Sequence, residues 1–177
     1  MLNEAERRQL VDLARRSVEA RVSGRRGAAP PDPVSTPASG VFVTVKVSGE
    51  LRGCLGTLEC RDLATDVVRC AADAASEDPR FAPVASHELT ALTVEVSILG
   101  PLERIDPLEP ESIVVGRDGL VVEDGHQRGL LLPQVAAERH WTREQFLRQT
   151  CVKAGLRTEA WRHGAAVYRF SAEVFGE

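Results

Sequence analysis

A hairpin pattern in the first third of the chain most constrains the fold. Residues 41–47 (VFVTVKV) alternate branched apolar side chains with other residues, which predicts a β-strand. Ser48-Gly49 predicts a tight turn, and residues 50–59 (ELRGCLGTLE) return as a second strand. We expect this hairpin, residues 41–58, to be the structural centre of the molecule, with one of its faces in the core. The side chains expected to be buried together on that face are Val41, Val43, Val45, Leu51 and Leu55.

Capped amphipathic segments supply the helices that such a sheet needs. Asn3 and Glu6 form a capping-box pattern at the start of residues 3–23, where apolar residues recur at helical spacing. Similar patterns predict helices at 62–77, 133–140 and 142–155, strands at 90–99 and 166–175, and hairpin turns at Asp118-Gly119 and Asp124-Gly125. Helices and antiparallel hairpins alternate without a βαβ rhythm, so the predicted class is α+β.

Length and hydropathy indicate one domain that does not cross a membrane. The 177 residues suit a single domain over residues 1–177. Residues 24–40 are rich in proline and glycine and predict a flexible loop, of which 27–37 is expected to be dispensable for folding. No stretch approaches the ~20 apolar residues of a membrane span. The N-terminus is charged and lacks a signal core, which predicts a cytoplasmic protein with reduced cysteines.

The charge distribution disfavours a protein that coats nucleic acid. The net charge is −4, whereas such proteins need a basic footprint. Residues 7–26 hold seven arginines against Asp12 and Glu19, a local charge of +5. On a helix, such a run is more often a solvated face than a site for a polyanion.

Spacing of the usual ligand residues predicts neither a metal site nor a cofactor. The cysteines stand at 54, 60, 70 and 151 without a C-x2-C pair, and the histidines at 87, 126, 140 and 163 without a metal-binding motif. The glycine-rich phosphate loops and the G-x-S-x-G nucleophile elbow are also absent from the sequence.

The sequence RGCLGT, residues 52–57, is the strongest candidate for chemistry. Two glycines beside a thiol weaken a strand and often mark the close approach of a ligand or another backbone. Arg52 and Cys54 are expected on one face, where the guanidinium could stabilise a thiolate, and these two are the candidate catalytic residues. Alternatively, Cys54 is a small buried apolar residue, and the glycines accommodate a bulge or a crossing helix. Cys70 and Cys151 are expected in the core, and Cys60 has no expected role.

Polar residues from other segments are candidates to line a cleft around this motif. Asp78 and Arg80 form a loop pair that either secures the loop or binds a ligand. Glu95 and Ser97 lie on the polar face of a strand, which is either solvent-exposed or the floor of a cleft. The full set of candidate cleft residues is Gly53, Gly56, Thr57, Arg80, Glu95, Ser97 and Gln134.

Several strings together resemble a known family. They are GVFVTVKVSGELRGCLGTLE, EDPRFAPV, LTVEVSILGPLE, VGRDGLVVEDGHQRGLLLPQVA and TCVKAGL, in this order. They are similar to the AMME-syndrome candidate-gene-1 protein family (AMMECR-type), whose bacterial members are called AmmeMemoRadiSam system protein A. The likeness runs from about residue 3 to residue 175, and the stretch near 27–37 departs from the family's pattern.

The resemblance implies a fold and partners but no settled activity. The implied fold is α+β, an antiparallel sheet flanked by helices in two unequal lobes. The implied partners are a Memo-like protein and a radical SAM enzyme. Two functional classes stay open: an enzyme or covalent carrier that uses Cys54, and a non-catalytic adaptor that binds partner enzymes or a nucleic acid.

Overall fold

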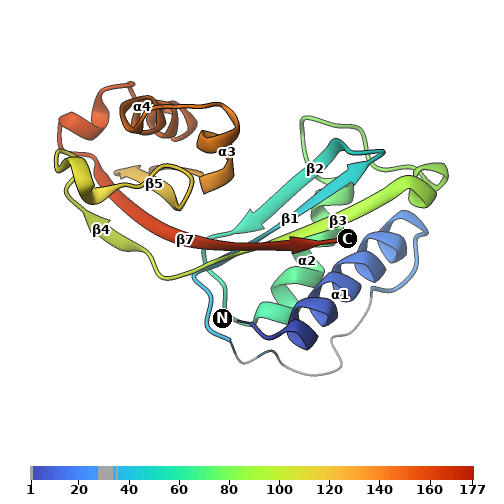
Figure 1. Cartoon of the computed structure of the whole chain (residues 1–177). Coiled ribbons are helices and arrows are strands. Elements are labelled where there is room, and N and C mark those ends of the chain that lie inside the picture. The colour runs from blue at the N-terminus through green and yellow to red at the C-terminus, as the bar shows by residue number, and fades with distance from the viewer. Residues whose placement is uncertain (1, 28–33, 35) are drawn as a thin grey trace. The chain divides into compact units, whose positions relative to one another are not determined.

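The computed structural model describes residues 2–27, 34 and 36–177 (Figure 1). Its α-helices are α1 (Glu4–Val22), α2 (Leu63–Ser76), α3 (Pro133–Glu138) and α4 (Arg143–Lys153). Its strands are β1 (Gly40–Val47), β2 (Glu50–Thr57), β3 (Leu92–Leu99), β4 (Glu103–Ile105), β5 (Asp118–Asp124), β6 (Gln127–Leu131) and β7 (Ala166–Gly176). The strand order is β2-β1-β3-β7-β5-β6, and β4 pairs with β7. The predicted α+β class with an antiparallel sheet and flanking helices is confirmed.

The chain divides into two unequal compact units. The first unit comprises Met1–Leu99 and Glu173–Glu177, and the second comprises Gly100–Ala172. Strand β7 contributes to both, because its N-terminal part pairs with β5 in the second unit and its last residues belong to the first. Among the described residues, no helix is both long and apolar enough to span a membrane.

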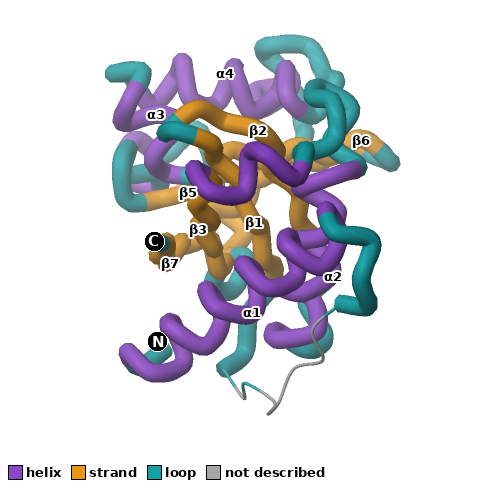
Figure 2. Tube along the Cα trace, turned by 90° about the vertical axis from the view of Figure 1, so that its right-hand side faces the viewer, coloured by secondary structure: helices purple, strands orange, loops and turns teal. Residues whose placement is uncertain are grey.

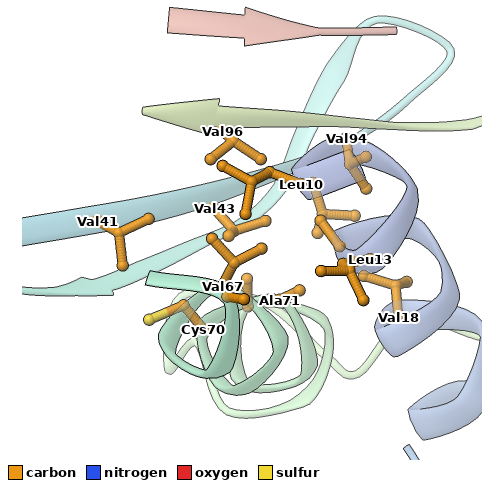
Figure 3. Packing of buried hydrophobic residues seen from close by; sticks show 14 of the residues in the cluster. Leu10, Leu13, Val18, Val41, Val43, Val67, Cys70, Ala71, Val94 and Val96 are labelled. Carbon is orange, nitrogen blue, oxygen red and sulfur yellow. The ribbon is translucent and has the colours of Figure 1, made fainter. Parts of the chain in front are cut away.

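In the first unit, α1 and α2 pack against one face of β1, β2 and β3 (Figures 1 and 2). Figure 3 shows leucines of α1 meeting valines of the strands and the apolar side of α2. The predicted cap of α1 is present, because Asn3 and Glu6 each accept a hydrogen bond from the other's backbone N–H. Val41, Val43 and Val45 are fully buried as expected, and Leu55 packs against this core while partly buried.

In the second unit, α3 and α4 cover β5 and β6. Phe146, Leu147 and Cys151 of α4 are buried with Leu120 and Val122 of β5. Thr142 caps α4 together with Gln145, as the sequence predicts. Gly129 of β6 lets the end of α4 approach, because a Cβ there would lie 2.3 Å from the backbone nitrogen of Ala154.

The hairpin turn predicted at Asp118-Gly119 is wrong. Both residues lie inside β5, and the chain reverses earlier, around Gly116, which has a φ of +90°. The Asp118 carboxylate accepts a hydrogen bond from the backbone of Val114, so it closes that earlier turn. Gly119 makes room for an aromatic ring, since a Cβ there would lie 2.3 Å from Phe170. By contrast, the turn predicted at Asp124-Gly125 joins β5 to β6 as expected.

Most of the proline-rich segment lies outside the described residues. The loop expected at 24–40 includes residues 28–33 and 35, which the structure does not describe. Val34, within it, is buried and belongs to the first unit's core. Whether 27–37 is dispensable therefore remains a prediction, and a replacement linker should retain Val34.

Candidate functional site

A β-bulge shapes the RGCLGT motif on β2. The register with β1 shifts once, so that Val45 faces Gly53 while Lys46 faces Leu51, and Arg52 is left as the extra residue. The bulge places Leu51 on the face of the sheet opposite the helices, where it is 39% exposed. The expectation that Leu51 is buried with Leu55 is therefore wrong, because a one-residue insertion reverses which face a side chain occupies.

Arg52 uses its guanidinium to hold a distant segment. Its Nε and Nη2 donate to the two carboxylate oxygens of Glu88 at 2.7 and 2.9 Å, and its Nη1 donates to the carbonyl of Ala82 at 3.2 Å. The two hydrogen bonds from Arg52 to the Glu88 carboxylate, together with one from the backbone N–H of Ala85, lower the pKa of Glu88 to about 2. The guanidinium of Arg52 therefore binds residues 82–88, and its predicted role as the cation beside the Cys54 thiol is not what these hydrogen bonds support.

A buried carboxylate, Asp78, joins the same segment to Cys54. Its Oδ2 accepts from the backbone N–H of Cys54 at 2.9 Å and from Nη2 of Arg80 at 2.7 Å. Its Oδ1 accepts from the backbone N–H and Nε of Arg80. The hydrogen bonds from the Arg80 side chain are the main reason that the pKa of Asp78 lies well below its usual range. Asp78 and Arg80 therefore secure the loop, one of the two roles considered for them.

These contacts lie along the open edge of the sheet. Strand β2 is the end strand, so one row of its backbone groups has no neighbouring strand. Residues 78–88 run beside that edge, held by Arg52, Glu88, Asp78 and Arg80. We call these four residues the edge clamp. The clamp fixes the backbone of Cys54 on its outer side.

The thiol of Cys54 lies on the sheet face opposite the helices. It is half-buried, and the hydroxyl of Thr44, its cross-strand neighbour on β1, donates a hydrogen bond to Sγ at 3.2 Å. Thr44 in turn faces Glu95 of β3, whose carboxylate forms an ion pair with Lys46 at 3.4 Å. Cys54, Thr44 and Glu95 thus form one row across three strands.

Ser97 lies on the same sheet face as Glu95, two residues further along β3. It faces Phe42 of β1, which in turn faces Gly56 of β2. Its hydroxyl is buried and has no hydrogen-bond partner among the described residues. The structure therefore brings Cys54, Glu95 and Ser97, three of the sequence candidates, to a single face.

The remaining candidates have separate roles. Gly53 accommodates α2, because a Cβ there would lie 1.8 Å from the carbonyl oxygen of Ala74. Gly56 lies against the ring of Phe42, and the Thr57 hydroxyl accepts from the backbone of Glu59 in a local turn. Gln134 belongs to α3 in the second unit, whereas Cys54 belongs to the first unit. The bulge and the crossing helix were both considered in the alternative interpretation of the glycines, and both are present.

Residues that sequence reasoning missed are Glu88 and Thr44. Glu88 stands 36 positions after Arg52 and follows no motif that would mark it as a partner. The contact between Thr44 and Cys54 could have been predicted from the sequence, because the correct register between β1 and β2 places the two residues opposite each other. Among residues 2–27, 34 and 36–177, no group of three His, Cys, Asp or Glu side chains is arranged as metal ligands would be.

Thiol labelling at pH 8 is expected to modify Cys54 first. Burial is the main cause that raises the pKa of Cys60 to about 12 and that of Cys70 to about 11, and it also raises the pKa of Cys151. At pH 8, Cys60 and Cys70 would then be thiolate in roughly one molecule in ten thousand and one in a thousand. Alkylation followed by peptide mass mapping should find about one label per folded chain, at Cys54. Faster modification of Cys60 would contradict this prediction.

Comparison with known proteins identifies relatives of this chain. The family model AMMECR1 matches residues 11–175. A protein of Thermofilum pendens is 46% identical, with 95% of this chain and 88% of that protein covered. Protein TK0174 of Thermococcus kodakarensis is 48% identical over the same shares of the two chains. The crystal structure of the uncharacterized protein PH0010 from Pyrococcus horikoshii superposes with a TM-score of 0.89 at 42% identity, covering 99% of this chain and 93% of that one. The chain therefore belongs to the AMMECR1 family.

Proposed function

We propose that this protein acts through the thiol of Cys54, as an enzyme or a covalent carrier that works with a Memo-like protein and a radical SAM enzyme. The observation that carries the proposal is the setting of the thiol. Cys54 is half-buried, accepts a hydrogen bond from Thr44 and faces away from the helices. Its backbone is held by Asp78 on one side and by the pairing with β1 on the other. A side chain fixed in this way is suited to repeated chemistry at one point.

Arg80 supports the proposal as the nearby cation. It shares one oxygen of Asp78 with the backbone N–H of Cys54, so its guanidinium lies in the same cluster of hydrogen bonds. Its side chain is about half exposed and also lies over the ring of Phe81, at 5.3 Å from the centroid.

The proposal extends to the domain and its location. The matched range, residues 11–175, includes both compact units, which supports a single functional domain. The four free cysteines agree with a reducing, cytoplasmic location.

Substitution of Cys54 by serine tests the proposal. The serine hydroxyl can keep a hydrogen bond with Thr44, so the free energy of unfolding should change by less than about 1 kcal/mol. Binding to the Memo-like protein and the radical SAM enzyme of the same organism, or turnover with them, should be lost. Cys60→Ser is the matched control, because Cys60 is also half-buried but lies after β2, where its backbone N–H donates to the carbonyl of Ser39. Equal loss in both variants, or loss in proportion to unfolding, would contradict a role for the thiol.

A non-catalytic adaptor is the second candidate. The hydrogen-bond partner of the thiol is a hydroxyl, which is a poor general base, and this observation favours an adaptor. Full partner binding by Cys54→Ser would support it. Nucleic acid is the weaker choice of partner, because the arginines of α1 are neutralised by acidic neighbours: Arg7 by Glu173, Arg8 by Glu4, Arg15 by Glu19, Arg16 by Asp12 and Arg21 by Asp73.

A further inference from the structure

The second unit contains a cavity of about 690 Å³ that the proposed function does not use. We propose that it binds a small zwitterion of the amino-acid or short-peptide type, with an ammonium group, a carboxylate and an apolar part. Its volume lies within the usual range for small-molecule sites. The proposal does not depend on Cys54, because all the lining residues belong to the second unit.

Two segments that lie apart in the sequence meet at this cavity. Asp124 ends the first strand of the DGHQRG hairpin, and Leu156 ends the string TCVKAGL. The chain after Leu156 completes the wall with Arg157, Thr158, Ala160 and His163. Neither string has a part in the site around Cys54, so their meeting point is a separate feature of the molecule.

Two opposite charges face the cavity without pairing. Among the described residues, the side chains of Asp124 and Arg157, both exposed, have no hydrogen-bond or ion-pair partner, and their charged groups are more than 4.0 Å from each other. The adjacent carboxylate differs, because Glu159 is engaged by Arg148 at 2.8 Å and by Arg162 at 3.1 Å. A ligand that carries both charges would supply the partner that each side chain lacks.

A hydrogen bond joins the two turns that line the cavity. Gln127 Nε2 donates to the carbonyl of Gly155 at 2.8 Å, which ties the hairpin to the chain leaving α4. Gly125 and Gly155 have φ values of +59° and +75°, which favour glycine and define both turns. Asp124 and Arg157 are thus presented from two turns that are joined by a hydrogen bond.

The side chains indicate how the ligand would lie. Arg157 offers a planar guanidinium that suits a carboxylate, and Asp124 offers an acceptor for an ammonium group. Leu156 and Ala160 provide an apolar surface between polar groups. An amino acid or short peptide with an apolar side chain carries all three features in one molecule.

Titration monitored by protein NMR tests this inference. The probes are L-leucine and L-leucyl-L-leucine, with N-acetyl-L-leucine lacking the ammonium group and L-leucinamide lacking the carboxylate. At least one of the two zwitterionic probes should shift resonances near Leu156 with a Kd of about 1 mM. N-acetyl-L-leucine and L-leucinamide, which each lack one charge, should bind at least about ten-fold more weakly. Comparison of the two zwitterions distinguishes a free amino acid from a peptide.

Substitution of Arg157 and of Asp124 provides a second test of the inference. Arg157→Gln and Asp124→Asn should each weaken binding of the zwitterion at least about ten-fold. Arg104→Gln is the matched control, because Arg104 is also exposed and lies outside the cavity; it should leave the affinity unchanged. No shifts at about 20 mM probe, or equal binding by all four probes and all variants, would overturn the inference. Neither result would bear on Cys54, whose test measures partner binding.

Discussion

Replacement of Asp78 by asparagine is expected to lower the free energy of unfolding by about 3 kcal/mol. The Asp78 side chain is 2% exposed, and among the described residues its two oxygens accept hydrogen bonds only from the backbone of Cys54 and from Arg80. An asparagine would present an NH2 group to at least one of these donors and would leave the Arg80 charge without its partner. Urea unfolding of the variant and of the unmodified protein measures the difference.

Asp12→Asn is the matched control for this prediction. Asp12 also pairs with an arginine, Arg16, but on the solvent side of α1, where such pairs contribute roughly 0–1 kcal/mol. Similar losses in the two variants would contradict a structural role for the buried carboxylate.

The effect of Asp78 should depend on pH in one direction. The folded-state pKa of Asp78 lies below its unfolded value of about 3.9, so its stabilisation is complete above that pH and is lost as the pH falls further. The difference in stability between the unmodified protein and Asp78→Asn should therefore be constant from about pH 5 to 8 and narrow below about pH 4. Glu88, with a pKa of about 2, titrates in the same direction, but it is present in both proteins and cancels in the comparison. A difference that widens in acid would refute this assignment.

Gly53→Ala is expected to destabilise the first unit by about 3 kcal/mol or more. The new methyl group would lie 1.8 Å from the carbonyl oxygen of Ala74 and 2.9 Å from its carbonyl carbon. Both are backbone atoms of α2, so no side-chain rotation can relieve the overlap, and the helix must move away from β2. Near-UV circular dichroism and urea unfolding measure the result, and a variant that fails to fold agrees with the prediction.

Gly27→Ala is the control, because no atom in the part of the chain that the structure describes lies within 4 Å of a Cβ built there. Its stability should stay within about 0.5 kcal/mol of the unmodified protein. If Gly53→Ala were equally harmless, α2 would not be packed as closely on β2 as the structure has it.

Local signals in the sequence were sufficient to predict most of the elements. The capping boxes at Asn3 and Thr142 act within four residues, so the sequence specifies them without reference to the rest of the fold. The valines of β1 alternate without interruption, and all three of the core valines are buried as expected. In these segments, local preference and tertiary packing agree.

The failures arise where a distant residue decides the outcome. The bulge at Arg52 depends on how β2 pairs with β1, and Arg52 is then held by Glu88, 36 positions away. A pattern of alternation cannot reveal either contact, and Leu51 was assigned to the wrong face. Asp118-Gly119 has the composition of a turn, but Phe170 packs against the glycine and the strand continues through it. For the candidate site, the same limit explains why the sequence singles out Cys54, Arg52, Asp78 and Arg80 but not Glu88, which holds Arg52.

The division of β7 between the two units has a consequence for how the protein is made. The last residues of β7 complete the first unit: Glu173 pairs with Arg7, and the backbone N–H of Glu177 donates to Val94 of β3. A ribosome that has finished residue 99 must still add the 73 residues of the second unit before this strand exists. At a translation rate of about 5–20 residues per second, the edge of β3 that pairs with β7 stays unpaired for roughly 4–15 s. During that interval the nascent chain offers a strand edge to other chains, so folding of the first unit during translation depends on protection of β3 until the C-terminal strand arrives.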